Sequence, residues 1–296
     1  LLHNAFKVRV KFKLGLFNVG KMGKLSTGLI YSIALALVWG VAYPLTRMAE
    51  AYASPMIISV VRVTVASLLM YPLARRLILN SRMLIVAVLN MGLFLVLLNI
   101  SILYSPNPGL AALMVYTQPL FVAIFEWLIL KRGFSLMRIS GILLGFIGVA
   151  VASLNSVSIS LGVVMGLMAG LLWGLGTILY SMWFKDVDPL VANASSSVLS
   201  IPVTALALPI DPILSLTLKG ILLVLIVVLD AQVLGFILWF KAISSERPST
   251  VSSILLLTPI LALYFSALII KSSITAFEAL GTVITIIGLL MVVGSR

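Results

Sequence analysis

Apolar residues fill most of the chain in stretches of about 20, the length that a helix needs to cross a bilayer. Short polar segments separate these stretches, with Pro, Ser, Asn and Asp at the breaks, as in Ser54-Pro55 and Asp188-Pro189. Only helices and closed barrels satisfy their backbone hydrogen bonds in lipid. The pattern therefore predicts an all-α membrane protein with ten transmembrane helices at 26–48, 55–75, 82–104, 109–130, 135–153, 160–183, 189–209, 217–240, 248–270 and 275–294.

The chain contains an internal repeat, because residues 109–149 recur at 249–289. Chance explains shared Leu and Ile in so apolar a chain, but it is a poor explanation for shared Pro, Lys and Gly in one register. We therefore expect a leader over 1–25, a first five-helix repeat over 26–153 and a second over 160–294. The matched pairs are Pro119 with Pro259, Phe125 with Phe265, Lys131 with Lys271, Gly141 with Gly281, and Gly148 with Gly288.

Basic residues lie mostly at one end of the predicted spans. With both termini in the cytoplasm, the outer loops hold only Arg47, Lys219 and Lys271. This bias follows the positive-inside rule and predicts a multi-pass protein of the cell membrane with both termini cytoplasmic. The cytoplasmic side holds the basic leader and Arg75, Arg76, Arg82, Lys131, Arg132, Arg138, Lys185, Lys241, Arg247 and Arg296.

Five spans are an odd number, so the second repeat must enter the membrane upside down. The cytoplasmic Lys131, Arg132 and Arg138 align with Lys271, Ser272 and Glu278, which face outward under this topology. Inverted repeats are the architecture of secondary transporters, in which the substrate site lies near the bilayer midplane between the halves.

Composition narrows the function classes. The chain is 62% apolar and 9% charged, whereas a soluble domain has about a quarter of its residues charged. The net charge of +12 is explained by the positive-inside bias, so we expect no nucleic-acid partner. There is no Cys, and the single His is His3, which argues against a metal or a catalytic His. Without a P-loop, direct use of ATP is not expected, and we predict no cofactor and no enzymatic activity.

The leader is basic and interleaved with Phe and Val, and it lacks the cleavage site of a signal peptide. It is either an interfacial amphipathic segment or a stretch that precedes a true start at Met22.

Several short motifs along the chain resemble those of a known family in their order and spacing. The first span reads Trp39-Gly40 and ends at Arg47, Trp173-Gly174 is its counterpart in the second repeat, and Arg62 lies in the second span. With the Pro119 and Pro259 stretches, these motifs resemble the EamA-type, ten-helix members of the drug/metabolite transporter superfamily over about 26–294. The resemblance implies efflux of small metabolites, amino acids or amphipathic compounds, driven by the proton gradient or by exchange.

One feature departs from that family. Its members often carry a Gly-Glu pair where the fourth and ninth spans end, and this chain has Lys131-Arg132 and Lys271-Ser272 there. The role that this acid has in relatives is therefore not transferred.

Ionisable groups inside a bilayer are costly and are functional candidates by default. Asp230 lies in the eighth span and aligns with the neutral Asn90. A buried carboxyl that titrates near neutrality can exchange a proton for substrate, so Asp230 is our first coupling candidate. Alternatively, it bonds to Gln232 and only fixes packing.

Two further charged groups lie near the ends of their spans. Arg62 can clamp a substrate carboxylate or phosphate, or it has a structural role with Glu50 as partner. Glu126 is a second proton-site candidate, or it pairs with Arg132 or Arg138 and locks the inner face.

Other candidates are polar or aromatic groups that fit a mainly apolar binding cavity with a few aimed donors and acceptors. An anchoring or packing role is the alternative for each aromatic residue. This set comprises Asn90, Asn99, Trp39, Tyr43, Tyr116, Gln118, Trp173, Tyr180 and Trp239.

Proline and glycine positions indicate bends and close helix packing. Pro44, Pro119 and Pro259 remove helix hydrogen bonds, and the matched pair Pro119 and Pro259 are hinge candidates for alternating access. Glycines recur every fourth residue in the sixth span from Gly162 to Gly174, which permits close packing within the chain or across a homodimer seam. Gly141, Gly145 and Gly148 do the same in the fifth span.

We thus expect a permease, a monomer or homodimer, that binds a small organic solute, with the proton as its candidate coupling ion. Three alternatives stay open: a membrane enzyme acting on lipids, a non-transporting scaffold, and a nucleotide-sugar or phosphate-ester antiporter. The last requires more basic residues in the cavity than Arg62.

Overall fold

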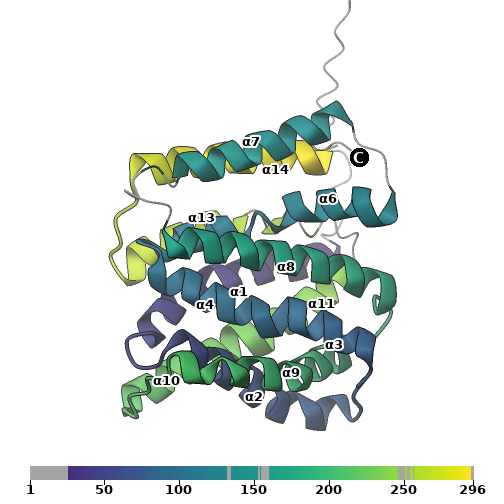
Figure 1. Cartoon of the computed structure of the whole chain (residues 1–296), viewed down its shortest axis with the longest axis vertical. Coiled ribbons are helices and arrows are strands. Elements are labelled where there is room, and N and C mark those ends of the chain that lie inside the picture. The colour runs from purple at the N-terminus through teal and green to yellow at the C-terminus, as the bar shows by residue number, and fades with distance from the viewer. Residues whose placement is uncertain are drawn as a thin grey trace, which may run out of the picture.

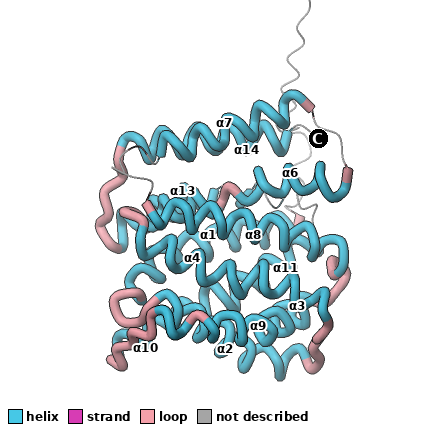
Figure 2. Tube along the Cα trace, in the orientation of Figure 1, coloured by secondary structure: helices cyan, strands magenta, loops and turns pink. Residues whose placement is uncertain are grey.

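The structure is a computed structural model that describes residues 26–131, 135–152, 154, 160–245, 251, 254–255 and 257–294. Figure 2 shows helix over nearly all of this part, with loops confined to the helix ends. The β structure within the described ranges is one isolated bridge between Ala53 and Leu214. The leader, Arg132 and Arg247 lie outside the described residues.

The first repeat supplies five helical positions, of which the third and fourth are each made from more than one segment. Its elements are α1 (Thr27–Ala49), α2 (Pro55–Ala74), α3 (Ser81–Ala87), the π-helical turn η2 (Val88–Gly92), α4 (Leu93–Tyr104), α5 (Pro108–Val115), α6 (Gln118–Leu130) and α7 (Leu136–Ala152).

The second repeat follows the same plan, and its third position also contains a π-helical turn. Its elements are α8 (Leu161–Trp183), α9 (Pro189–Leu206), the 3-10 turn η3 (Leu208–Ile210), α10 (Leu218–Val227), the π-helical turn η4 (Val228–Leu234), α11 (Gly235–Ser245), α13 (Leu257–Ile269) and α14 (Ala276–Gly294).

Seven helices in the described chain are long and apolar enough to cross a membrane, and shorter apolar helices occupy 139–152, 257–269 and 276–288. Together they stand at the ten predicted positions, which confirms the all-α membrane fold. The eighth span is longer than predicted, because its helix continues to Ser245.

Matching residues start the helices of the two repeats. Ser26 and Ser160 cap α1 and α8, each accepting a backbone N–H bond at 3.3 Å. Ser54 caps α2 and Asp188 caps α9, and a proline follows each cap at the first helical position, where its missing N–H has no cost.

The ends of the fourth and ninth spans also match. Lys131 and Lys271 both adopt a left-handed backbone conformation, with φ of 51° and 53°. Such a helix end favours glycine, which has no Cβ to collide with the carbonyl oxygen. The family's glycine at this position therefore has a structural explanation, and here lysine adopts the same conformation.

The last helices of the two repeats, α7 and α14, pack along each other on one side of the bundle, opposite α2, α9 and α10 (Figure 1). A Cβ on Gly281 would approach the Gly148 carbonyl oxygen to 2.5 Å, and one on Gly288 would approach that of Gly141 to 2.6 Å. Because the later residue of one helix meets the earlier residue of the other, the helices are antiparallel. This geometry is that of an inverted repeat, as predicted.

The glycines of α8 face other helices of the same chain. A Cβ on Gly166 would approach the Met114 side chain to 2.6 Å, and one on Gly170 would approach the Val115 carbonyl to 2.8 Å. The stripe is thus packed against α5 and its neighbours, which supports close packing within the chain over a homodimer seam on this face.

The fourth span is interrupted at Tyr116 and Thr117, between α5 and α6. Pro119 explains the interruption, since proline has no N–H and its ring clashes with the carbonyl four residues earlier, on Val115. Pro259 lies near the start of α13, in the matching place.

Candidate functional site

A cavity lies between the two repeats, near the middle of the helices. About 410 Å³ of space there is free of atoms, including the part that is open to the surroundings. Its wall is built from α1, α2, α4, α5, α8, η4 and α11. Most of the wall is apolar or aromatic, and Arg62 is the one charged residue among the described residues that line it.

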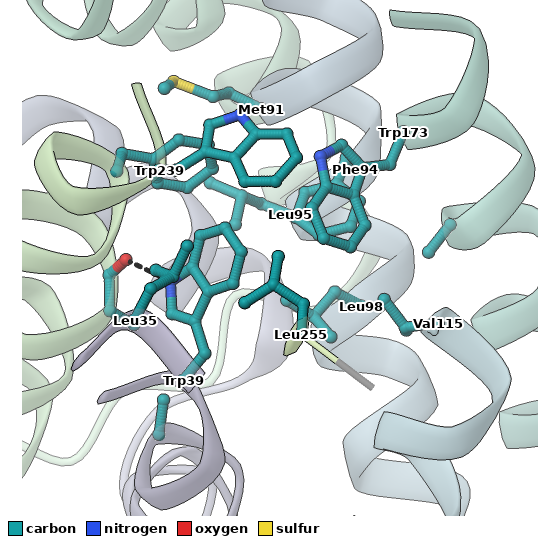
Figure 3. Close-up of a cluster of buried hydrophobic side chains, with 14 of the residues drawn as sticks. Leu35, Trp39, Met91, Phe94, Leu95, Leu98, Val115, Trp173, Trp239 and Leu255 are labelled. Atoms are coloured by element: carbon teal, nitrogen blue, oxygen red, sulfur yellow. Dashed lines mark hydrogen bonds between the residues drawn. The ribbon is translucent and has the colours of Figure 1, made fainter. Parts of the chain in front are cut away.

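Aromatic rings form much of the cavity wall near the middle of the helices. Trp39 of α1 and Trp173 of α8, the matched tryptophans of the repeats, meet edge to face with centroids 5.5 Å apart. The Trp239 ring, with its centroid 5.2 Å from that of Trp173, packs beside them without lining the cavity. Figure 3 shows these three indoles close together with Phe94. Offset and edge-to-face contacts of this kind stabilise a rigid wall.

The two matched tryptophans differ in hydrogen bonding. The Trp39 indole Nε1 donates to the Ala231 carbonyl at 3.1 Å, which ties α1 to η4 (dashed line in Figure 3). The Trp173 Nε1 is buried without a hydrogen-bond partner among the described residues. A buried donor normally has a partner, so the Trp173 indole N–H is an unsatisfied donor beside the cavity.

Arg62 of α2 is 3% exposed and lines the cavity. Its Nε finds no hydrogen-bond partner in the described part of the chain, while its charge interacts with Tyr43 and Asp230. The expected alternative partner, Glu50, pairs instead with Arg47 at 3.7 Å. Arg47 also donates to the Ile102 carbonyl at 3.1 Å, at the end of α4.

Asp230 is half-buried in η4, across from Arg62. Its neighbour Ala231 lines the cavity, whereas Asp230 itself does not. Its buried Oδ2 has no hydrogen-bond partner within the described ranges, and no salt bridge joins it to Arg62 there. The alternative bond to Gln232 is not formed, because the Gln232 side-chain amide contacts the Met91 sulfur at 3.5 Å.

Several polar candidates hold helices together rather than face the cavity. Asn99 donates to the Ser59 hydroxyl at 2.9 Å, and Gln118 donates to the Thr177 hydroxyl at 3.1 Å. Neither lines the cavity, whereas Tyr43 and Tyr116 do.

Tyr180 and Glu126 lie away from the cavity. Tyr180 packs against Phe240 with ring centroids 5.0 Å apart, near the C-terminal end of α8. Glu126 is buried in α6. Its expected partners, Arg132 and the side chain of Arg138, lie outside the described residues.

Two groups of residues were missed by sequence reasoning. Thr46, Phe94 and Phe236 line the cavity, yet no sequence signal separates them from other residues of apolar spans. In α9, Asn193, Ser196 and Ser197 are fully or almost fully buried and donate to methionine sulfurs of α2, α3 and η2. The run Asn193-Ala-Ser-Ser-Ser was a visible signal, because consecutive polar residues in a span need partners.

No group of three or more His, Cys, Asp or Glu that could hold a metal occurs within the described ranges. The site is therefore defined by an apolar, aromatic cavity, one arginine and a nearby carboxyl group.

Comparison with known proteins gives the same architecture. The model of the EamA-like transporter family matches residues 26–154 and again 160–294. "Uncharacterized transporter YvbV" of Bacillus subtilis is 30% identical over 93% of this chain and 92% of its own length. "Protein PecM" of Dickeya dadantii is 23% identical over 86% of this chain and 88% of its own.

A solved crystal structure shares the fold, with a TM-score of 0.67 at 15% identity over 89% of this chain and 95% of that one. The fold, the duplicated helices and the family matches agree with the resemblance seen in the motifs. The chain belongs to the EamA-like transporter family and is a multi-pass membrane protein.

Proposed function

We propose that this protein is a secondary transporter that moves small amphipathic organic solutes, such as amino acids or related metabolites, out of the cell by alternating access. It lies in the cell membrane with both termini cytoplasmic. The observation that carries the proposal is the cavity between the repeats, which combines aromatic walls with the buried Arg62 guanidinium. Ligand cavities are typically apolar with a few polar groups that fix orientation.

The two ends of the bundle support alternating access. The cavity reaches from Trp39 and Trp173 toward Thr46 and Ile102, at the ends of α1 and α4. On the other side of the tryptophans, Tyr180, Phe184 and Phe240 pack together and close the bundle. Transport then requires this packing to open as the cavity closes, with the interruption at Pro119 and its counterpart Pro259 as hinges.

Asp230 is the proposed proton site. A lone carboxyl at mid-span with an unpartnered oxygen, close to a guanidinium, can change its protonation as a solute arrives at Arg62. Glu126 is the competing site. Arg62 is the one basic residue on the described cavity wall, which argues against a nucleotide-sugar or phosphate-ester antiporter, and the cavity itself argues against a scaffold.

The test measures proton release from purified protein in detergent when candidate amino acids and amphipathic metabolites are added. We expect a bound solute to displace protons from the wild type and from Glu126→Gln, but not from Asp230→Asn. Binding is followed in parallel by the quenching of tryptophan fluorescence.

Three other outcomes would each contradict a different part of the proposal. Loss of release in Glu126→Gln alone moves the proton site to α6. Solutes that bind without proton release from any form contradict proton exchange and indicate uniport or solute exchange. No flux into proteoliposomes for any bound solute contradicts transport.

A further inference from the structure

A second hollow lies on the outer surface of the bundle, separate from the central cavity. About 510 Å³ of space, including the part that is open to the surroundings, lies between α2, α10 and the segment that precedes α10. Its wall includes Ile57, Val61, Ile221, Val224 and Leu225. Apart from Ser215 and the Tyr52 hydroxyl, the described side chains that line it are apolar, so the groove has no chemistry for a polar solute.

The segment between α9 and α10 is unusually apolar for a connection. Leu216 is 78% exposed, and Ile210 and Ile213 are exposed too. Surface loops of this length are normally polar, and large exposed apolar patches mark contact with lipid or with another protein.

Backbone hydrogen bonds hold this segment against the turn between α1 and α2. Ser54 N donates to the Ile213 carbonyl at 2.8 Å, and Ser215 N donates to the Tyr52 carbonyl at 2.6 Å. The segment is therefore a fixed wall of the groove: Leu214 and Leu216 line it, while Ile210 and Ile213 are exposed beside it.

A positive charge stands at the entrance of the groove. Lys219 is exposed in the first turn of α10, and its ammonium lies 5.9 Å from the centre of the Tyr52 ring. The ring contact occupies one side of the ammonium, which keeps donors for another acceptor. Asp211, the acid of this connection, does not line the groove.

The groove runs from this charged entrance along the helices toward the bilayer interior. From Gly220 to Leu225 the helix rises about 7.5 Å, at about 1.5 Å per residue. An acyl chain follows the same direction, and its phosphate stays at the interface beside the helix starts. A cation at the surface end and an apolar channel below it match one ligand, an anionic phospholipid.

We propose that this groove binds one acyl chain of an anionic phospholipid whose phosphate contacts Lys219. The bound lipid braces α2 against α10. The wall residue Val61 directly precedes Arg62, and α10 belongs to the same continuous helix as Asp230. This site is separate from the solute cavity and stands whether or not the protein exports solutes.

The experiment counts lipids retained by the full-length protein in native mass spectrometry, with phosphatidylglycerol or phosphatidylcholine of identical chains added in detergent. We expect one phosphatidylglycerol to be retained in preference to phosphatidylcholine. Ile221→Trp fills the groove and abolishes this retention, whereas Leu222→Trp, on the same helix but outside the groove, retains it.

The headgroup contact is tested separately. Lys219→Gln is expected to weaken phosphatidylglycerol binding about fivefold and to remove the preference over phosphatidylcholine, since one lysine near an anionic surface contributes that much. Lys185→Gln, an exposed lysine elsewhere, is the control. If inorganic phosphate alone displaced the phosphatidylglycerol, the site would bind an anion and not a lipid.

Three results would overturn the proposal. Equal lipid counts for Ile221→Trp and Leu222→Trp would mean that retained lipid is not in the groove. An unchanged preference in Lys219→Gln would remove the phosphate contact. A dimer that dissociates in Ile221→Trp without loss of lipid would make the groove a contact between two copies.

Discussion

The third spans of the two repeats share one backbone irregularity and use it differently. Each contains a π-helical turn, η2 or η4, and the third residue of the turn is Asn90 in one repeat and Asp230 in the other. Asn90 is 3% exposed and packs against Gly176 of α8, where a Cβ would approach its Oδ1 to 2.2 Å. Asp230 is half-buried and lies across from Arg62.

The neighbouring helix explains part of this difference. Gly176 stands three residues after Trp173, and the corresponding position three residues after Trp39 is Ala42, which lines the cavity. The glycine leaves room for a neutral amide to pack into α8. π-Helical turns occur frequently at functional sites, and here one copy serves packing while the other carries the charge.

The largest expected effect comes from making the two turns alike. Asp230→Asn gives η4 the neutral group of η2 and removes the proton site, so proton-driven flux should fall about 5- to 150-fold, the range of a typical coupling free energy. Solute binding should remain, because Arg62 and the aromatic wall are unchanged. The measurement is flux into proteoliposomes with and without a pH gradient. Equal gradient dependence in both proteins would contradict the assignment.

The second prediction concerns the packing of η2 against α8. Gly176→Ala places a methyl group against the Asn90 side chain, which must rotate away. Overpacking of a tight interface should lower the free energy of unfolding by about 1–3 kcal/mol. Unfolding in mixed micelles measures this change, and Gly176→Ala combined with Asn90→Ala should recover most of the loss. An unaffected single variant would show that the contact is loose.

A smaller effect is expected from changing the matched tryptophans, Trp39 and Trp173. Trp39→Phe removes the hydrogen bond to the Ala231 carbonyl, whereas Trp173→Phe removes a donor without a partner among the described residues. Trp39→Phe should therefore destabilise the protein by about 1 kcal/mol more than Trp173→Phe. Trp173→Phe should instead weaken solute binding. The two effects are separated by unfolding in mixed micelles and by solute titration; equal stabilities would remove the distinction.

The smallest expected effect lies at the matched helix ends. Lys131→Gly and Lys271→Gly each place glycine in a left-handed conformation, and each should raise the free energy of unfolding by up to about 1 kcal/mol. Similar gains at both sites would support the same backbone geometry in both repeats. Destabilisation at either site would indicate that the lysine side chain contributes there.

The candidate site was only partly accessible from sequence. Asp230 and Arg62 stood out because charge in a span is costly, and the structure packs their segments η4 and α2 against each other without a salt bridge between the two side chains in the described chain. Asn99 and Gln118 stood out for the same reason, but they bond to Ser59 and Thr177 and hold helices together. Polarity inside a span shows that a group needs a partner, and it does not show whether that partner is protein or solute.

The sequence alone determined the helical spans, the duplication and the family, because span length, repeated residues and loop charge are properties of the linear chain. The tertiary structure decided which side chains meet. Helices that are apolar all round do not reveal their rotation, so sequence did not reveal that Phe94 and Phe236 line the cavity. Nor did it reveal the two π-helical turns, whose backbone depends on how each third span packs against its neighbours.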